Sequence, residues 1–168
     1  MSLSIYKGDI TRFEGDAIVN AANCSLLGGG GVDGAIHRAA GPGLLAECRL
    51  LNGCQTGEAK ITKGYCLPSK YVIHTVGPIY SFSRKERCAE LLRGCYRNSI
   101  SLAHSYGCVR VAFPLISAGV YGYPKEEALS IAVEMILENG SDLDVSIVLF
   151  DDEAIATAKR LFDAYCHF

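Results

Sequence analysis

The chain has 168 residues, of which 49% are hydrophobic and 20% are charged, and its formal net charge is −2. This length suits one domain with a substantial core, and no apolar run reaches the roughly 18 residues that a membrane-spanning helix needs. The slightly negative charge and the absence of a long basic stripe argue against binding to duplex nucleic acid. A small anionic ligand remains possible, because local backbone dipoles can hold it without net positive charge.

The N-terminal segment MSLSIYKGD contains no charged region followed by an apolar one. We therefore expect a cytoplasmic protein without membrane attachment. We also expect a monomer. The eight cysteines are irregularly spaced and include no C-x-x-C pair. In a reducing compartment, we expect most of them to be small, buried hydrophobic side chains.

The first half of the chain contains six expected elements in the order strand, strand, helix, helix, strand, strand. They are Leu3–Tyr6, Ala17–Asn20, Val32–Ala40, Leu44–Leu51, Glu58–Tyr65 and Tyr71–Val76. The segment Gly41-Pro42-Gly43 is expected to interrupt the two helices. Glu58–Tyr65 alternates apolar and polar residues, which favours a position near an edge of the sheet.

The second half is expected to alternate between helix and strand. Its elements are the helix Glu86–His104, the strand Val109–Ile116, a helix from Pro124 to Gly140, the strand Val145–Phe150 and a helix from Ile155 to Tyr165. Pro114 cannot donate to a strand ladder and should lie near a strand end. The apolar stripe of the second helix comprises Leu129, Ala132, Val133, Ile136 and Leu137. The pattern predicts an α/β fold with a mixed sheet of about six strands and helices on both faces.

Four consecutive glycines, Gly28–Gly31, separate the second expected strand from the first expected helix. Bare N–H groups at a helix N-terminus can hold a phosphate, and missing Cβ atoms let the ligand come close. Gly29, Gly31 and Gly34 also match the G-x-G-x-x-G fingerprint of nicotinamide-dependent oxidoreductases. Residues 24–27 separate these glycines from the strand, and no second strand with an acidic residue follows at the required spacing, so the context disfavours that function. A flexible surface loop is the other alternative.

A second loop rich in small residues, PLISAGVYGYP at residues 114–124, follows another buried strand and precedes another helix. Ligands of α/β sheets bind beyond the carboxyl ends of the strands. Two such loops on one sheet are what a clamp for a diphosphate requires.

Five motifs occur in order along the chain: GDIT at 8–11, VNAAN at 19–23, GGGGVDGAIHRAAGP at 28–42, HTVGP at 74–78 and PLISAGVYGYP at 114–124. Together they resemble the macrodomain family, specifically its MacroD-type ADP-ribosyl hydrolases. The resemblance covers nearly the whole chain and implies a single macrodomain over residues 1–168. It also implies a three-layer α/β/α sandwich that binds ADP-ribose at the ends of the central strands.

The resemblance assigns each ligand contact to a position of this sequence. Asp9 would accept a hydrogen bond from the adenine amino group beside the backbone of Ile10, and Phe150 would pack on the adenine face. Asn23 would hydrogen-bond the distal ribose. Tyr121 lies in a glycine-flanked loop where core burial is awkward, so we expect it to cover a ribose. The residues expected to hold the diphosphate are Gly30, Gly31, Val32, Ser117, Ala118, Gly119, Val120 and Tyr121.

Four of these candidate positions have a structural alternative. Asp9 can instead cap the short turn at residues 10–13. The alternative for Phe150 is a place in the core, and the alternative for Asn20, another ligand candidate, is to brace the loop from the strand end. His74 lies in an apolar strand, which favours a hydrogen-bonded core histidine over a catalytic one.

Asp33 and His37 decide between hydrolysis and binding alone. They are four residues apart, so they project from one face near the start of the helix. A carboxylate is unfavourable for binding near a phosphate, which makes a catalytic role more intelligible. The alternative is that Asp33 is a favourable acid in a first helical turn and that His37 is a solvated helix residue.

The resemblance favours catalysis, because the Asp and His of GGGGVDGAIH match the hydrolytic branch of the family. It implies Asp33, His37 and Asn23 as catalytic residues and requires no metal or cofactor. The implied reactions are removal of ADP-ribose from mono-ADP-ribosylated Asp or Glu side chains and deacetylation of O-acetyl-ADP-ribose. The expected partners are therefore ADP-ribose, ADP-ribosylated proteins and O-acetyl-ADP-ribose. A reader module that binds ADP-ribose without turnover is the alternative function.

Overall fold

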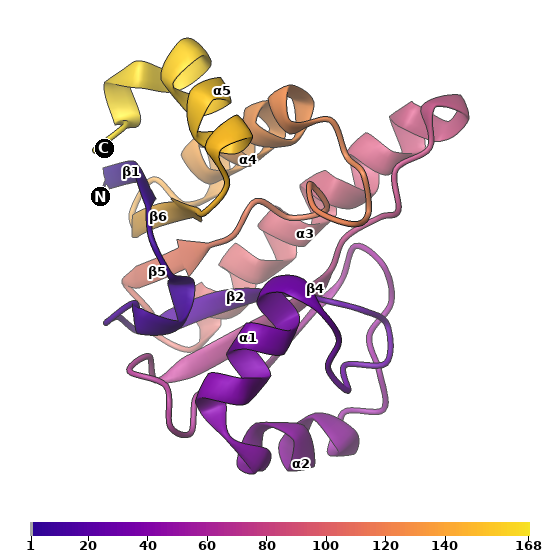
Figure 1. Cartoon of the computed structure of the whole chain (residues 1–168). Helices are drawn as coiled ribbons and strands as arrows, with labels where there is room; N and C mark the ends of the chain where they lie inside the picture. The colour runs from indigo at the N-terminus through magenta and orange to yellow at the C-terminus, as the bar shows by residue number, and fades with distance from the viewer. Residues whose placement is uncertain (1) are drawn as a thin grey trace.

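The computed structural model describes residues 2–168, and its centre is a six-stranded mixed sheet in the order β1-β6-β5-β2-β4-β3 (Figure 1). The strands are β1 (Ser2–Lys7), β2 (Ala17–Ala22), β3 (Ala59–Lys63), β4 (Tyr71–Val76), β5 (Arg110–Phe113) and β6 (Asp144–Leu149). Five strands run parallel, whereas β3 pairs antiparallel with β4 at one edge. The edge position predicted for Glu58–Tyr65 is thus confirmed.

Five helices cover the two faces of this sheet (Figure 1). They are α1 (Gly31–Ala40), α2 (Pro42–Leu50), α3 (Lys85–Ser105), α4 (Lys125–Asn139) and α5 (Asp152–Phe162). Helices α1 and α2 lie on one face, and α3, α4 and α5 lie on the other. The predicted three-layer α/β/α sandwich is confirmed.

Two apolar clusters bind the layers together, because successive strand residues point to opposite faces of the sheet. Ile18 of β2 packs in the cluster that contains Ile36 and Leu44 of α1 and α2. Its neighbour Val19 packs in the cluster that contains Leu92 of α3. Burial of one such aliphatic side chain contributes about 1.5–3 kcal/mol, so the two faces together hold β2 at the centre of the sheet.

The structure corrects several details of the predicted elements. The strand predicted at Val109–Ile116 is shorter, because β5 begins at Arg110 and ends at Phe113. Only Gly41, with φ at +83°, separates the first two helices, because Pro42 is the first residue of α2. A proline is well tolerated there, since the first helical N–H has no partner within the helix. Leu137 does not belong to the buried stripe of α4: it is 46% exposed. Pro114 directly follows β5, as its missing N–H predicts.

The carboxyl ends of the parallel strands lie together, and the loops that carry the five motifs gather there. Ala22 at the end of β2 lies beside Val76 at the end of β4, and Lys7 at the end of β1 lies beside Leu149 at the end of β6. Most of the eight cysteines are buried, and none forms a disulfide within residues 2–168. In the same part of the chain, no helix combines the length and apolar character needed to cross a membrane.

Candidate active site

The loop between β2 and α1 is organised by the side chain of Asn23. Its Nδ2 donates to the Gly28 carbonyl at 3.0 Å, and its Oδ1 accepts from the Ser25 backbone N–H at 3.0 Å. These hydrogen bonds connect the start of the loop to Gly28. One hydrogen of the Asn23 amide remains for a ligand.

Helix α1 begins at Gly31 with an N-terminus that no side chain in residues 2–168 caps. Gly30 is the N-cap residue, and Gly31 has φ at +57°. The first N–H groups of a helix have no partner within the helix, and here Gly30 and Gly31 are exposed. A Cβ on Gly30 would meet no heavy atom within 4 Å. The start of α1 is thus open to an anion.

Two further glycines press this loop against the first turn of α1. A Cβ on Gly34 would lie 2.5 Å from the carbonyl oxygen of Gly29, so only glycine fits there. A Cβ on Gly29 would lie 3.2 Å from Asp33 Oδ2 and 3.3 Å from Asn23 Nδ2. The carboxylate of Asp33 and the amide of Asn23 consequently face the same point of the glycine loop.

Asp33 is a carboxylate that the fold buries: it is only 4% exposed. Its Oδ1 accepts a hydrogen bond from Asn20 Nδ2 at 2.9 Å and lies 3.4 Å from His37 Nε2. Burial raises the pKa of Asp33, and the Asn20 hydrogen bond and the His37 ring oppose that rise only in part. Because its pKa is raised, the ionised carboxylate of Asp33 is a stronger base than that of an exposed aspartate.

Asn20 connects Asp33 to the interior of the sheet. Its Nδ2 also lies 3.1 Å from His74 Nδ1, and because an amide nitrogen donates, this ring nitrogen must accept. His74 Nε2 therefore carries the proton and donates to Thr62 Oγ1 at 2.9 Å. Thr62 donates in turn to the Lys63 carbonyl at 3.1 Å. A chain of hydrogen bonds thus connects the edge strand β3 with Asp33, and Asn20 Nδ2 donates in both directions along it.

His74 is completely buried, and burial lowers its pKa to about 3, so the ring is neutral at pH 7. This agrees with the prediction of a hydrogen-bonded core histidine. Asn20 is also completely buried and holds Asp33, which is the geometry of the bracing alternative. Two buried atoms in this network, Asn20 Oδ1 and His37 Nε2, have no hydrogen-bond partner within the described chain.

The second loop, between β5 and α4, is tied to the segment that follows β4. Ser117 has φ at +67°, and its buried hydroxyl donates to the Pro78 carbonyl at 2.8 Å. The Tyr80 N–H donates to the Tyr121 carbonyl at 2.9 Å. Gly119 and Val120 are exposed, and their N–H groups make no backbone hydrogen bond within residues 2–168. Ser117 therefore braces the loop through its side chain, while the tip of the loop offers bare N–H groups.

Asp9 and Phe150 follow the ends of the neighbouring strands β1 and β6. The Gly8 N–H donates to the Leu149 carbonyl at 2.9 Å, which brings residues from the two ends of the chain side by side. Asp9 Oδ1 accepts from the Thr11 N–H at 3.0 Å, so Asp9 does cap the short helix at Ile10–Arg12. This bond and that of the Thr11 hydroxyl lower the pKa of Asp9. Phe150 is 74% exposed, so the alternative of a core role is wrong.

The structure thus gathers Asn23, Asp33 and His37 at one point of the sheet edge. The alternative of a solvated His37 is wrong, because its side chain is 14% exposed. The sequence contains no signal for the role of Thr62, because this residue belongs to no motif and its hydrogen-bond partner lies on a neighbouring strand. In the described part of the chain, no three His, Cys, Asp or Glu side chains gather as metal ligands do.

The fold is a three-layer α/β/α domain, and two loops of small residues lie around an open helix N-terminus at the carboxyl ends of its parallel strands. These features define a ligand-binding domain. The Macro domain family matches residues 19–132, and the chain belongs to that family. A Macro domain-containing protein of Methanosarcina mazei is 60% identical over 162 residues, which are 94% of this chain and 86% of that protein.

Two further comparisons concern relatives whose names state a ligand or an activity. Human ADP-ribose glycohydrolase MACROD2 is 62% identical over 136 residues, 81% of this chain, although these make up only 32% of that longer protein. The structure of an Oceanobacillus iheyensis macrodomain mutant with ADPR has a TM-score of 0.89 and 44% identity, and the match covers 96% of this chain and 92% of that one. The Trypanosoma brucei macrodomain in complex with ADP-ribose has a TM-score of 0.85 and 47% identity, with 94% and 68% covered.

Proposed function

We propose that this chain is a hydrolase that removes ADP-ribose from mono-ADP-ribosylated Asp and Glu side chains and deacetylates O-acetyl-ADP-ribose. The observation that carries the proposal is the buried Asp33 carboxylate, which Asn20 anchors directly beside the glycine loop. The similarity to MACROD2 and to macrodomains in complex with ADP-ribose supports it. Its substrates are ADP-ribosylated proteins and O-acetyl-ADP-ribose.

In the proposed complex, ADP-ribose lies along the edge of the sheet. The adenine stacks on the exposed Phe150 ring and donates its amino group to Asp9. Stacking on an exposed aromatic ring contributes about 1–3 kcal/mol per base. The diphosphate accepts from the N–H groups at the start of α1, Gly30 to Val32, and from the bare N–H groups of Gly119 and Val120 in the loop Ser117 to Tyr121. The distal ribose accepts the remaining amide hydrogen of Asn23.

The chemistry follows from the two oxygens of Asp33. Oδ1 is engaged by Asn20, and Oδ2 faces Gly29 and the Asn23 amide. In the proposed reaction, Asp33 accepts a proton from a water molecule whose oxygen forms a bond to the ester carbon. The bond between that carbon and the bridging ester oxygen breaks, the proton held by Asp33 passes to the departing oxygen, and the products are free ADP-ribose and the free carboxylic acid. General base catalysis of this kind contributes about 10²–10⁴-fold in rate, and a raised pKa favours it.

His37 lies close enough to act on Asp33 without touching the water. Its Nε2 is 3.4 Å from Asp33 Oδ1 and has no hydrogen-bond partner among residues 2–168. We assign it an orienting role, toward Asp33 or toward a hydroxyl of the distal ribose. A carboxylate near a diphosphate weakens binding by repulsion, so its retention here is explained by catalysis rather than by affinity.

The proposal is tested with Asp33→Ala, because this change removes the base and leaves both loops in place. We expect calorimetry to show an affinity for free ADP-ribose close to that of the parent, and we expect little ADP-ribose release from a glutamate-modified protein. Undiminished release would refute the catalytic role of Asp33. A parent protein that binds ADP-ribose and releases none would instead be a reader module. In isotopically labelled water, label in the released acid marks attack at the acyl carbon, and label in ADP-ribose marks attack at the anomeric carbon.

A further inference from the structure

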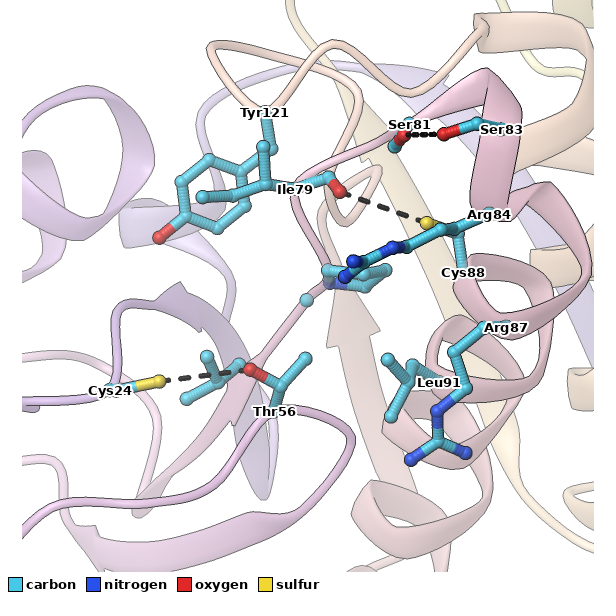
Figure 2. A pocket seen from close by; sticks show the side chains of 13 residues that line it. Cys24, Thr56, Ile79, Ser81, Ser83, Arg84, Arg87, Cys88, Leu91 and Tyr121 are labelled. Carbon is cyan, nitrogen blue, oxygen red and sulfur yellow. Dashed lines mark hydrogen bonds between the residues drawn. The ribbon is translucent and has the colours of Figure 1, made fainter.

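A cavity of about 520 Å³ lies between the second glycine loop and the start of α3 (Figure 2). We call it the Arg84 pocket. Its lining residues are Cys24, Thr56, Val76, Gly77, Pro78, Ile79, Ser81, Ser83, Arg84, Arg87, Cys88, Leu91 and Tyr121. This volume is within the range of pockets that hold small molecules or a few side chains, and none of the catalytic candidates Asn23, Asp33 and His37 lines it.

The Arg84 pocket is continuous with the proposed active site at two residues. Cys24 directly follows Asn23 in the first loop, and Tyr121 belongs to the second loop. The segment between β4 and α3, which forms much of the pocket, is joined to the second loop by the hydrogen bonds of Tyr80 and Ser117. In the proposed complex, the distal ribose binds Asn23, the neighbour of Cys24, so the pocket opens where the group attached to that ribose must extend.

The charge of the pocket comes from arginine alone. Arg84 and Arg87 are its only charged lining residues, although the whole chain has a net charge of −2. The guanidinium group of Arg84 has no ion-pair or hydrogen-bond partner in the described residues. Arg87 pairs with Glu90 at 3.3 Å, and both side chains are exposed. Exposed pairs of this kind contribute little and exchange readily for another carboxylate.

The remaining walls suit a polypeptide rather than a free ion. Ile79 is 70% exposed, and it lies with Tyr121 on one side of the pocket, facing Arg84 (Figure 2). Leu91 and the aliphatic stems of the two arginines form the other side. An apolar wall opposite two guanidinium groups matches a segment that presents backbone and carboxylates together.

We propose that the Arg84 pocket binds the polypeptide around the modified residue and selects substrates in which further acidic residues flank it. This inference rests on the proposed function, because it places the attached protein at the distal ribose. Guanidinium groups bind carboxylates through paired, charge-assisted hydrogen bonds. The proposed substrate is thus a protein whose ADP-ribosylated acidic side chain lies within an acidic stretch of the polypeptide.

The test measures binding, so that it does not depend on turnover. Two short peptides carry ADP-ribose on one side chain through an amide that resists hydrolysis, with Asp and Glu flanks in one and Asn and Gln flanks in the other. We expect the parent to bind the acidic peptide about tenfold more tightly at low salt, and we expect this ratio to fall as salt screens the charges. The double variant Arg84→Ala/Arg87→Ala should bind both peptides equally.

The matched control is Arg97→Ala, which removes an exposed arginine of the same helix that does not line the pocket. It should keep the preference of the parent. The proposal is overturned if the parent binds the two peptides equally, or if the preference survives in the double variant. Failure of the proposed function is recognised separately, because the parent would then fail to release ADP-ribose from a glutamate ester or to bind free ADP-ribose at all.

Discussion

Replacement of Asn20 by Leu tests whether the interior hydrogen-bond chain sets the basicity of Asp33. Leucine has the same branching and number of heavy atoms as asparagine, but it leaves two buried acceptors, Asp33 Oδ1 and His74 Nδ1, without their donor at 2.9 and 3.1 Å. Each unsatisfied buried group costs about 1–3 kcal/mol. We therefore expect the free energy of unfolding of Asn20→Leu to fall by about 2–6 kcal/mol in urea titrations.

The same change should move the titration of Asp33. The Asn20 hydrogen bond lowers the pKa of this carboxyl against the effect of burial, so its removal raises that pKa further. A hydrogen bond to a charged acceptor contributes about 1.5–3 kcal/mol, and 1.4 kcal/mol is tenfold in an equilibrium constant. On the acidic limb of the pH–rate profile, the ionised fraction of Asp33 should fall at least about tenfold, and this limb should move to higher pH.

Two measurements follow this shift in the Asn20→Leu protein. One is the pH dependence of kcat/KM for release of ADP-ribose, and the other is the titration of the Asp33 carboxyl carbon by NMR. The control is Asn139→Leu, which removes an amide that donates to the Met135 carbonyl on α4. An Asn20→Leu protein that is folded and titrates like the parent would refute the argument that Asn20 tunes Asp33.

Three other substitutions probe the site. Asp33→Asn removes a buried carboxyl group whose pKa is raised, so thermal melts should show a more stable protein at neutral pH. This gain should vanish as the pH falls, because Asp33 of the parent then becomes protonated. Equal melts at all pH values would contradict this. Gly34→Ala places a Cβ 2.5 Å from a loop carbonyl oxygen, so it should lower stability by about 1–3 kcal/mol and weaken ADP-ribose binding. The control is Gly119→Ala, whose Cβ meets no heavy atom within 4 Å and which should leave stability unchanged. Phe150→Ala should change stability by less than about 0.5 kcal/mol but weaken ADP-ribose binding about tenfold in calorimetry, and Phe168→Ala, which removes another exposed ring, should bind like the parent.

Much of the fold was predictable because its signals are local. A run of glycines before an apolar period of 3.6 residues indicates the start of a helix, and α1 begins at Gly31, one residue before the predicted Val32. Asp33 and His37 share a face because four residues are close to one turn, and the structure places the two side chains 3.4 Å apart. The single error in the stripe of α4, Leu137, arose because residues at the border of a helical face are apolar whether or not another element covers them.

The environment of the candidate base was not predictable in this way. Asn20, His74 and Thr62 come from three strands, and only the pairing of β2 with β4 and of β4 with β3 brings them into one chain of hydrogen bonds. A shift of one residue in either register would turn these side chains to the opposite face. The Arg84 pocket has the same origin, since Cys24, Arg84 and Tyr121 belong to separate segments that meet only at the edge of the sheet.

The amino-acid sequence by itself therefore determined the order of helices and strands, the two small-residue loops and the spacing of Asp33 and His37, because neighbouring residues decide these features. Only the tertiary structure decided that Asp33 is buried, that His74 is neutral and that two arginines line a cavity beside Tyr121. Burial and pairing depend on which distant segments come together. The acidity of a group and the charge of a pocket follow from that assembly rather than from residue type alone.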